Sequence, residues 1–382
     1  MNIITDSQAL IEFCNNISNE AYITVDTEFL REKTYWSKLC LVQIASENHE
    51  AIIDPLADGI DLAPMIEVLF NPKILKIFHA ARQDLEIFFN ITGKVPTPIF
   101  DTQVAAMVAG FGESVGYERL VRDVLNVQID KSSRFTDWSK RPLSNKQLKY
   151  ALADVTHLLE VYKYLNDKLI ENGRAHWLTQ EMAILESVKT YDLQPTDVWR
   201  RIKMRNIKRN HLGAIMKLTE WRENEAREKN VPRNRIIKDD AIMEIAMQQP
   251  KSLQDLDGLR SIPKGFSRSE KARKMFEQYK IGCAINEDDL PDLSNHRPKQ
   301  KPDNGVLEMM KVVLRLVCEK ENVAAKLIAN SADLEKIALD DNADVAALKG
   351  WRREVFGLTA LNVKRGVAAL RIQDGGVEIF KI

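Results

Sequence analysis

Two carboxylates with the spacing of a β-strand are the first residues in the chain that suggest chemistry. Asp26 and Glu28 lie two positions apart in the largely apolar run 22–28 (YITVDTE). Alternate side chains of a strand share a face, so these like charges would repel each other and would each be costly to desolvate. A divalent cation offsets both penalties, and oxygen ligands suit Mg²⁺ or Mn²⁺. The alternative is a strand end where the acids reach water or pair with Arg31 or Lys33.

Two further acids lie beside predicted elements of a different kind. Asp84 follows a predicted strand at 74–78 and opens a predicted helix at 82–91, where an Asp is also a common cap or dipole partner. Asp154 lies in a long predicted helix with Tyr150 four residues earlier, so the two side chains share one face about 6 Å apart along the axis. A structural Tyr–Asp hydrogen bond is the alternative for this pair.

Four such carboxylates, from a strand, a helix start and a later helix, could enclose two metal ions. A pair of ions ~3.5–4 Å apart activates a water and stabilises the leaving oxygen in phosphoryl transfer. Tyr150 would position the attacking water, because an unperturbed phenol is too weak an acid to supply a base at neutral pH. These residues therefore favour a two-metal site for phosphoryl transfer.

The elements that must position these side chains follow from the hydrophobic periodicity. Short runs of β-branched or large apolar residues predict strands at 22–28, 39–45, 51–54 and 74–78, with helices at about 62–70 and 82–91. Helical patterns dominate from about residue 101, which predicts an α/β or α+β first domain. Ser144 and Gln147 fit a capping box that opens the long helix, Gly173 would end it, and a further helix would span about 174–190.

The C-terminal half contains a repeat with a period of 92 residues. This shift aligns Ile236 with Ile328, and it aligns Asp239 with Ser331, two good N-caps that would open equivalent helices. Two small helical domains are the simplest interpretation, since two copies are too few for a solenoid. Between them the polar stretch 286–304, with three prolines, is typical of a linker.

The net charge of the chain conceals an uneven distribution. The 382 residues carry 55 Lys+Arg and 55 Asp+Glu, a total that by itself argues against a nucleic-acid partner. Residues 1–200 carry 28 acidic and 20 basic groups, however, whereas residues 201–382 carry 27 and 35. Six cations lie within the ten residues 200–209, although such a run can also be a solvated helix face. An acidic part that could hold cations and a basic part that could hold phosphates therefore cancel.

Composition and cysteine use exclude several other classes of protein. With 45% apolar and 29% charged residues the chain is typical of globular proteins, and its length predicts two or three domains. No apolar run reaches the ~18 residues of a membrane span, and the N-terminus lacks the layout of a signal peptide. The four Cys are far apart without a CxxC, as is typical of reduced thiols. We therefore expect a cytoplasmic protein with no membrane and no obligate protein partner.

Five segments, in this order, resemble those of known exonucleases: four are similar to motifs of the DEDD superfamily, and the one at 138–143 is similar to the ribonuclease D type. They are VDTEF (25–29), LCLVQI (39–44), FHAARQD (78–84), WSKRPL (138–143) and QLKYALADV (147–155). The last has the Tyr-x-x-x-Asp form of one subgroup, and the subgroup with a His five residues before the Asp is disfavoured because that position is Lys149. The WSKRPL segment and the two helical modules, which are similar to HRDC domains, resemble the ribonuclease D family over essentially the whole chain. At 36–37 a Trp-Ser pair replaces the family's usual aromatic–Pro pair, which leaves only the local turn geometry open.

The resemblance implies a domain organisation and an activity. An α/β ribonuclease H-like exonuclease domain, a mixed sheet with helices, would span 1–195. Two all-α HRDC-like domains would follow at 205–285 and, in a more divergent form, at 305–382, joined by the linker 286–304. The implied activity is the 3′→5′ release of 5′-mononucleotides from RNA, with two divalent ions, Mg²⁺ or Mn²⁺. The implied partners are tRNA precursors and other structured-RNA 3′ ends.

The resemblance also assigns a role to each of the five motif residues. Asp26 would contact both ions, and Glu28 would bind one ion and contact the attacking water or the terminal 3′-hydroxyl. Asp84 would hold the outer ion largely through water, and Asp154 would hold the inner one. Tyr150 would hold the nucleophilic water.

Candidate RNA contacts flank these motifs or lie in the basic run. They are Thr27, Phe29, Gln43, His79, Trp138, Arg141, Arg200, Arg201, Lys203 and Arg205. For the aromatic and amide side chains among them a packing or structural role is the alternative. Asp101 would cap a helix or stand behind the metal ligands.

Two rival functions stay open on the sequence alone. A DNA 3′→5′ exonuclease of the proofreading type would share the metals and the fold, although the chain has no polymerase-length region and carries paired helical modules. A non-catalytic RNA-binding scaffold with a relic site is the second rival, although all four acids and Tyr150 are present.

Overall fold

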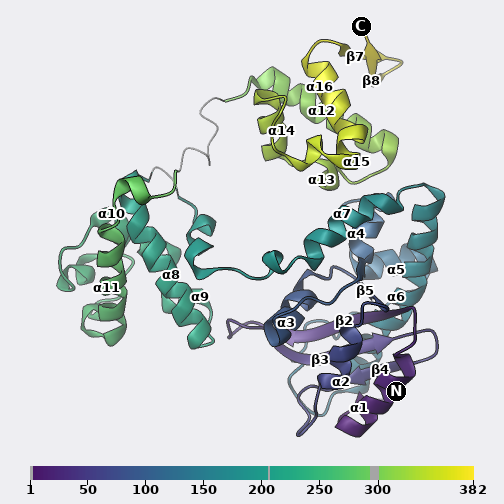
Figure 1. Ribbon diagram of the computed structural model, residues 1–382, viewed down its shortest axis with the longest axis horizontal. Helices are drawn as coiled ribbons and strands as arrows, with labels where there is room; N and C mark the ends of the chain where they lie inside the picture. Colours follow the sequence, from purple (N-terminus) through teal and green to yellow (C-terminus); the bar gives the residue numbers. More distant parts are fainter. Residues whose placement is uncertain (1–2, 205–206, 293–300) are drawn as a thin grey trace.

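A mixed sheet with its helices forms the N-terminal part of the molecule, and two helical units follow it (Figure 1). The computed structural model describes residues 3–204, 207–292 and 301–382. The first helical unit lies to one side of the sheet domain, and the second lies over α7 (Figure 1). This arrangement confirms the predicted fold class of a mixed sheet with helices followed by helical domains.

Six strands form the sheet, in the order β1-β4-β3-β2-β5-β6. They are β1 (Ile3–Ile4), β2 (Tyr22–Leu30), β3 (Lys38–Ala45), β4 (Glu50–Ile53), β5 (Leu75–Phe78) and β6 (Ile99–Asp101). Strand β2 pairs antiparallel with β3 and parallel with β5, so it has a neighbour on each side. The four predicted strands are confirmed with small shifts at their ends. Strands β1 and β6 escaped prediction because two and three residues are too few to show an alternating pattern.

The helices of this part include the one that carries two of the predicted site residues. The helices are α1 (Ser7–Ile17), α2 (Ala63–Leu69), α3 (Arg82–Thr92), α4 (Thr102–Val108), α5 (Tyr117–Leu125), α6 (Asn145–Glu171) and α7 (Ala175–Glu186). The capping box of Ser144 and Gln147 at the start of α6 is confirmed. Helix α6 packs against strands β2 to β5, and the Thr24 hydroxyl donates a 2.9 Å hydrogen bond to the backbone oxygen of Val155. This contact fixes the middle of α6 beside β2.

The two helical units repeat the same order of elements. The first contains α8 (Leu212–Glu228), α9 (Arg233–Ile236), α10 (Asp239–Gln248) and α11 (Glu270–Cys283); the second contains α12 (Asn304–Glu321), α13 (Ala325–Ile328), α14 (Ser331–Leu339), α15 (Gly350–Arg352) and α16 (Leu358–Lys364). The starts of α8, α9 and α10 precede those of α12, α13 and α14 by the predicted 92 residues. The N-caps are Lys238 and Asn330, one residue before the predicted caps, because the backbone is still extended there.

We expected the C-terminal unit to be entirely helical, and this expectation is wrong. Strands β7 (Ala368–Gln373) and β8 (Gly376–Lys381) form an antiparallel hairpin. Asp374 and Gly375, at its turn, both have positive φ, of 50° and 79°, which is the backbone of a type I′ turn. The Asp-Gly pair between alternating residues was the sequence signal for this hairpin.

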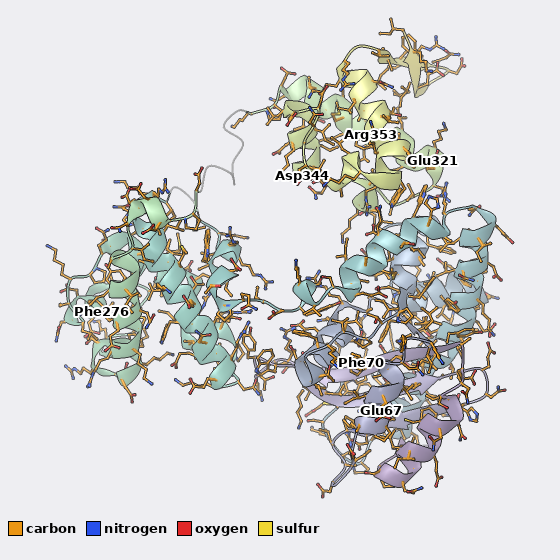
Figure 2. The ribbon with its side chains drawn as sticks, viewed as in Figure 1. Glu67, Phe70, Phe276, Glu321, Asp344 and Arg353 are labelled. Atoms are coloured by element: carbon orange, nitrogen blue, oxygen red, sulfur yellow. The ribbon has the colours of Figure 1, made fainter. Side chains whose placement is uncertain are left out.

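Each helical unit contacts the sheet domain in its own way. The second unit rests on α7, where the rings of Trp177 and Trp351 stack at 4.2 Å and Arg174 donates to the backbone oxygen of Glu321 at 2.6 Å. Glu321 is labelled at this side of the unit in Figure 2. The first unit contacts the turn between β2 and β3 through the polar side chain of Asn230. Within the described chain, the helices are too short or too polar to cross a membrane.

Candidate active site

Three of the predicted carboxylates meet at the centre of the sheet domain. Asp26 and Glu28 come from β2 and Asp154 from α6, and one oxygen of each lies within 4.8 Å of the others. The period of two in the strand places the first pair on one face, and the packing of α6 brings the third to it. A β-bulge follows directly after Glu28, so the register of the pairing with β3 shifts at this site.

Burial makes this cluster electrostatically unfavourable as it stands. Desolvation, reinforced by the Asp154 charge, raises the pKa of Asp26 well above its usual range. Burial, with the charges of Asp26 and Asp154, raises the pKa of Glu28 to about 10. Burial also raises the pKa of Asp154 to about 7, although a hydrogen bond from Tyr150 opposes the shift. Crowded oxygen ligands that resist ionisation together fit a divalent cation, which would favour the charged form of each one.

Asp84 lies at the edge of this cluster, in the first turn of α3. Its carboxylate accepts a 2.5 Å hydrogen bond from the Thr27 hydroxyl, and burial followed by the Asp26 charge raises its pKa well above the usual range. Asp101 caps α4, as predicted, and also accepts a 2.9 Å hydrogen bond from the backbone nitrogen of Ala81. Asp101 therefore holds the turn that carries Asp84, outside the group of three carboxylates.

Tyr150 lies one helical turn before Asp154 and is hydrogen-bonded to it. Burial, followed by the Asp154 charge, raises the pKa of the Tyr150 phenol above its usual range, so the group is neutral near pH 7. A second phenol was missed by the sequence reasoning. Tyr117 of α5 donates a 2.9 Å hydrogen bond to the backbone oxygen of Ala153, and its pKa is raised by burial and then by Asp154. Tyr117 lies far along the chain from every motif, so no sequence pattern indicated that it would approach Asp154.

Arg134 and Phe135 are two exposed residues that the sequence reasoning also missed. They lie in the segment between α5 and α6, with the Arg134 guanidinium 5.2 Å from the centre of the Phe135 ring. The Arg134 charge acts to lower the pKa of both Glu28 and Asp154, so it favours their charged forms. Phe135 is 92% exposed, and an aromatic residue inside a polar segment was the one available signal.

Three candidate RNA contacts lie around the carboxylates. Phe29 packs, partly buried, against the main core. Gln43 pairs with Asp26 across the sheet and is fully buried, and its amide atoms have no hydrogen-bond partner among the described residues. His79 contacts the Thr102 hydroxyl through Nδ1 at 2.9 Å, and burial lowers its pKa to about 4, so the ring is neutral.

Trp138 and Arg141 occupy structural positions in the described chain. Trp138 is 2% exposed, with its ring 6.1 Å from that of Tyr150. Arg141 forms a bidentate ion pair with Asp54 at 2.5 and 2.7 Å and donates to the backbone oxygen of Cys40 at 2.8 Å. This geometry favours the packing alternative for Trp138 and a structural role for Arg141.

The basic run divides into residues with different surroundings. Arg200 pairs with Asp197 at 3.2 Å, whereas Arg201 lines a cavity between the sheet domain and the first helical unit. Lys203 is exposed, and Arg205 lies outside the described residues. Of the three described candidates Arg200, Arg201 and Lys203, only Arg201 therefore lines this cavity.

Comparison with known proteins groups the chain with one set of relatives. Residues 1–170 match the family model described as 3′-5′ exonuclease, and residues 211–275 match the HRDC domain. Ribonuclease D of Nitrobacter hamburgensis is 46% identical, over 99% of this chain and 98% of that protein. Ribonuclease D of Bartonella henselae is 42% identical, over 99% of this chain and 93% of that protein.

Solved structures give the same grouping. The crystal structure of Escherichia coli RNase D, described as an exoribonuclease involved in structured RNA processing, is similar with a TM-score of 0.81 and 28% identity. That similarity covers 96% of this chain and 99% of the other. The catalytic core of RRP6 from Trypanosoma brucei shares the fold, with a TM-score of 0.56 at 23% identity over 74% of this chain and 80% of the other.

Proposed function

The chain belongs to the ribonuclease D family and is a 3′→5′ exoribonuclease, and we propose that it hydrolyses RNA through two divalent ions held by Asp26, Glu28, Asp84 and Asp154. One observation carries this proposal. Three carboxylates from β2 and α6, two half-buried and one buried, converge within 4.8 Å, in an environment that raises the pKa of each. Such a group is unfavourable without a cation and suited to Mg²⁺ or Mn²⁺ with one.

The residues around the cluster divide the chemical work. When bound, the two ions supply positive charge that activates a water and stabilises the leaving 3′ oxygen. Tyr150, neutral and hydrogen-bonded to Asp154, holds the attacking water in line rather than removing its proton. The Thr27 hydroxyl orients the Asp84 carboxylate, which would hold the outer ion largely through water. In this proposal Phe29 and His79 would contact the terminal nucleotide. Gln43 pairs with Asp26 across the sheet, and its amide has no hydrogen-bond partner among the described residues.

The substrates in this proposal are structured RNAs with 3′ extensions, such as tRNA precursors, in the cytoplasm. The similarity to Escherichia coli RNase D, whose description names structured RNA processing, supports this choice. The basic surplus of residues 201–382 supports it as well, because phosphate neutralisation supplies much of the affinity for nucleic acid.

We also propose that residues 305–382 form a second, divergent HRDC-like domain. The HRDC match covers only residues 211–275, but α12, α13 and α14 repeat α8, α9 and α10 at 92-residue spacing. A continuous helical segment in which a π-helical stretch (Arg353–Gly357) joins α15 to α16 takes the place of α11, and the hairpin β7–β8 is added after it, which accounts for the divergence.

The decisive experiment digests an RNA and a DNA oligomer of one sequence, each with Mg²⁺ or with EDTA. We expect 5′-mononucleotides released from the RNA 3′ end with Mg²⁺ and none with EDTA. A preference for DNA would overturn the proposed substrate, and undiminished digestion in EDTA would overturn the proposed metal site. Binding of RNA without any digestion would support the scaffold instead.

A further inference from the structure

An arginine-rich cavity of about 280 Å³ lies between the sheet domain and the first helical unit. Its walls are the turn after β2, one face of α3, the segment after α7 and the helices α8 and α9. Five arginines line it: Arg31, Arg82, Arg201, Arg227 and Arg233. Two acids, Glu86 and Asp192, share the lining, so positive charge exceeds negative charge within it. None of the five motif residues lies in these walls.

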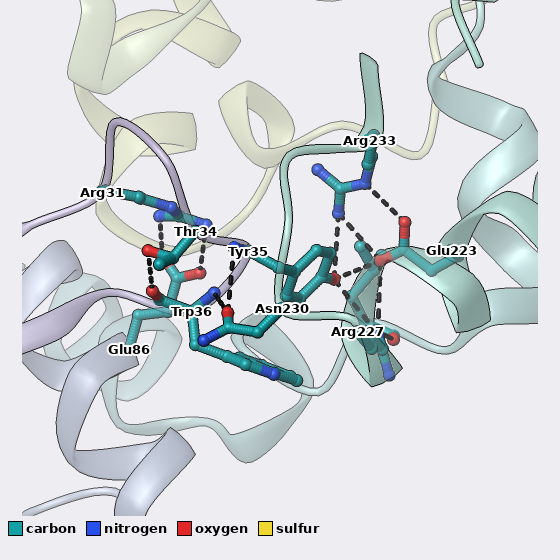
Figure 3. A network of polar contacts seen from close by, with 10 residues as sticks. Arg31, Thr34, Tyr35, Trp36, Glu86, Glu223, Arg227, Asn230 and Arg233 are labelled. Atoms are coloured by element: carbon teal, nitrogen blue, oxygen red, sulfur yellow. Dashed lines mark hydrogen bonds and ion pairs between the residues drawn. The ribbon is translucent and has the colours of Figure 1, made fainter. Parts of the chain in front are cut away.

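A buried polar network holds one side of the cavity in place (Figure 3). The Tyr35 phenol, which projects from the sheet domain, is hydrogen-bonded to Glu223 of α8, a residue with no exposed surface. Arg227 and Arg233 each donate to the Tyr35 oxygen at 3.1 Å, and Arg233 also donates to Glu223 at 2.9 Å. Asn230 accepts hydrogen bonds from the backbone of the same turn at 3.1 and 3.0 Å. These arginines are therefore fixed in position before any ligand arrives.

Two of the five arginines form no ion pair within the described residues. Arg31 is neutralised by a bidentate pair with Glu86 at 3.0 and 3.1 Å. Arg82 and Arg201 have no hydrogen-bond or ion-pair partner among the described residues, although both line the cavity. An unpaired guanidinium in a polar cavity is suited to a phosphate, which it can bind through two parallel hydrogen bonds.

Helix α3 connects this cavity to the carboxylate cluster. Arg82, Glu86, Phe89 and Asn90, at helical spacing, line the cavity, whereas Asp84 is on the opposite, buried side of the same helix. A helix with its side chains is about 10 Å across, which is about three stacked nucleotides at ~3.4 Å each. An RNA whose 3′ end lies at the carboxylates thus needs only a few nucleotides to reach Arg82.

We propose that this cavity binds one backbone phosphate of the RNA, about three or four nucleotides from the 3′ end, through Arg82 and Arg201. The inference rests on the proposed function in one respect, that the ligand is RNA entering the carboxylate cluster. The proposal assigns a phosphate contact to Arg201, the one described member of the basic run that lines this cavity. The volume of the cavity, about 280 Å³, is roughly that of nine waters at ~30 Å³ each. This volume leaves room for the sugar beside the phosphate.

The first test compares RNA lengths. Arg82→Ala and Arg201→Ala should each lower kcat/KM for a seven-nucleotide RNA by about 10-fold and change that for a dinucleotide by less than about twofold, because the dinucleotide does not reach the cavity. Arg273→Ala, an exposed change on α11 of the same helical unit, is the matched control. An equal loss for both lengths would show that these residues act at the 3′-terminal nucleotide, and no loss for either would leave the cavity without a role. Either result overturns the proposal.

The second test does not depend on catalysis. In the Asp26→Asn background, binding of a fluorescent seven-nucleotide RNA is measured while a single uncharged methylphosphonate replaces each phosphate in turn. One position should lower affinity by about 10-fold in the chain with both arginines and by much less in Arg82→Ala or Arg201→Ala. Equal losses in all three chains would exclude contact with that phosphate. If the metal-site proposal fails, this coupling can still be measured, so the two failures are distinguishable.

Discussion

The carboxylate cluster and the arginine cavity lie on opposite sides of α3 and are opposite in charge and in construction. The cluster joins two half-buried acids of β2 and one buried acid of α6, all within the sheet domain. The cavity joins five arginines from the sheet domain, the connecting segment and the first helical unit. The acids of the cluster repel one another, whereas the charges of the cavity are partly balanced by Glu86 and Glu223.

This difference shows how the work of the molecule is divided. A site for chemistry needs ligands held rigidly, and two packed elements of one domain supply that. A site that guides a long polymer can be assembled between domains, where its position depends on how the domains dock. Changes to the cluster should therefore affect turnover at every RNA length, and changes to the cavity should affect only RNAs long enough to reach it.

The largest effect should come from Asp26→Asn. Removing this shared ligand should lower kcat by at least about 10³-fold, because metal stabilisation of the transition state is worth several kcal/mol and each 1.36 kcal/mol is tenfold. Mononucleotide release is measured at saturating Mg²⁺, and RNA affinity should stay within a few-fold. Normal turnover in this variant would show that Asp26 is not a metal ligand of the active site.

Tyr150→Phe should reduce kcat by about 10- to 100-fold, the loss of one hydrogen bond of ~1.5–3 kcal/mol to the water. The ring and its packing against Trp138 are retained, so metal affinity should be unchanged. Single-turnover kinetics and Mn²⁺ titration together check this prediction. Loss of bound metal would show that the phenol is a structural partner of Asp154 instead.

Glu223→Gln should weaken binding of long RNA by about 10-fold and leave dinucleotide hydrolysis nearly unchanged. Arg233 and Arg227 outweigh the desolvation of this buried carboxylate and hold its pKa below the usual range, so a neutral replacement leaves two cations poorly compensated. Glu228→Gln, an exposed change on the same helix, is the control. A loss in dinucleotide turnover would mean that docking of the helical unit also shapes the cluster.

Replacing Arg200, Arg201 and Lys203 with Ala should flatten the salt dependence of RNA binding. For single-stranded RNA the slope of log K against log salt should fall by about 0.7 for each phosphate contact that is lost. Affinity is measured between low and moderate salt in the triple variant and in Arg201→Ala alone. If the single variant reproduces the triple one, the cavity accounts for the contact; an unchanged slope in both would return the run to a solvated face.

The smallest effect is on stability. The raised pKa of Asp154, about 7, means that the folded metal-free chain holds a proton that the unfolded chain releases above about pH 4. Stability without metal should therefore fall as pH rises from about 4 through 7, and Asp154→Asn should raise the metal-free Tm at pH 8 by a few degrees. Added Mg²⁺ should stabilise the unmodified chain and not the variant. A Tm that rises with pH in EDTA would contradict the cluster's repulsion.

Local patterns in the sequence were enough to find the cluster. The period of two in β2 placed Asp26 and Glu28 together, and the helical spacing placed Tyr150 beside Asp154, as the structure confirms. Both rules act within one element, so they need no knowledge of the fold. The predictions of the capping box and of the 92-residue repeat were confirmed for the same reason, because each rests on a pattern within single elements.

Contacts between elements could not be predicted in this way. Arg134 and Tyr117 approach the cluster from segments with no motif, and Trp138 and Arg141 turned out to pack against the sheet and pair with Asp54. The Asp-Gly turn of the C-terminal hairpin was a local signal, and it was obscured by the expectation of a wholly helical repeat.

By itself, the sequence identified the carboxylates that we propose as metal ligands, the elements that carry them and the order of the sheet and helical parts, because each depends on residues a few positions apart. Only the tertiary structure decided which arginines are left without an acidic partner among the described residues. Arg82 and Arg201 are 119 positions apart, and nothing local distinguishes them from Arg31 or Arg141, which find acids across the fold. Whether an arginine is free to bind a phosphate depends on what packs against it, and that is fixed only when distant parts of the chain meet.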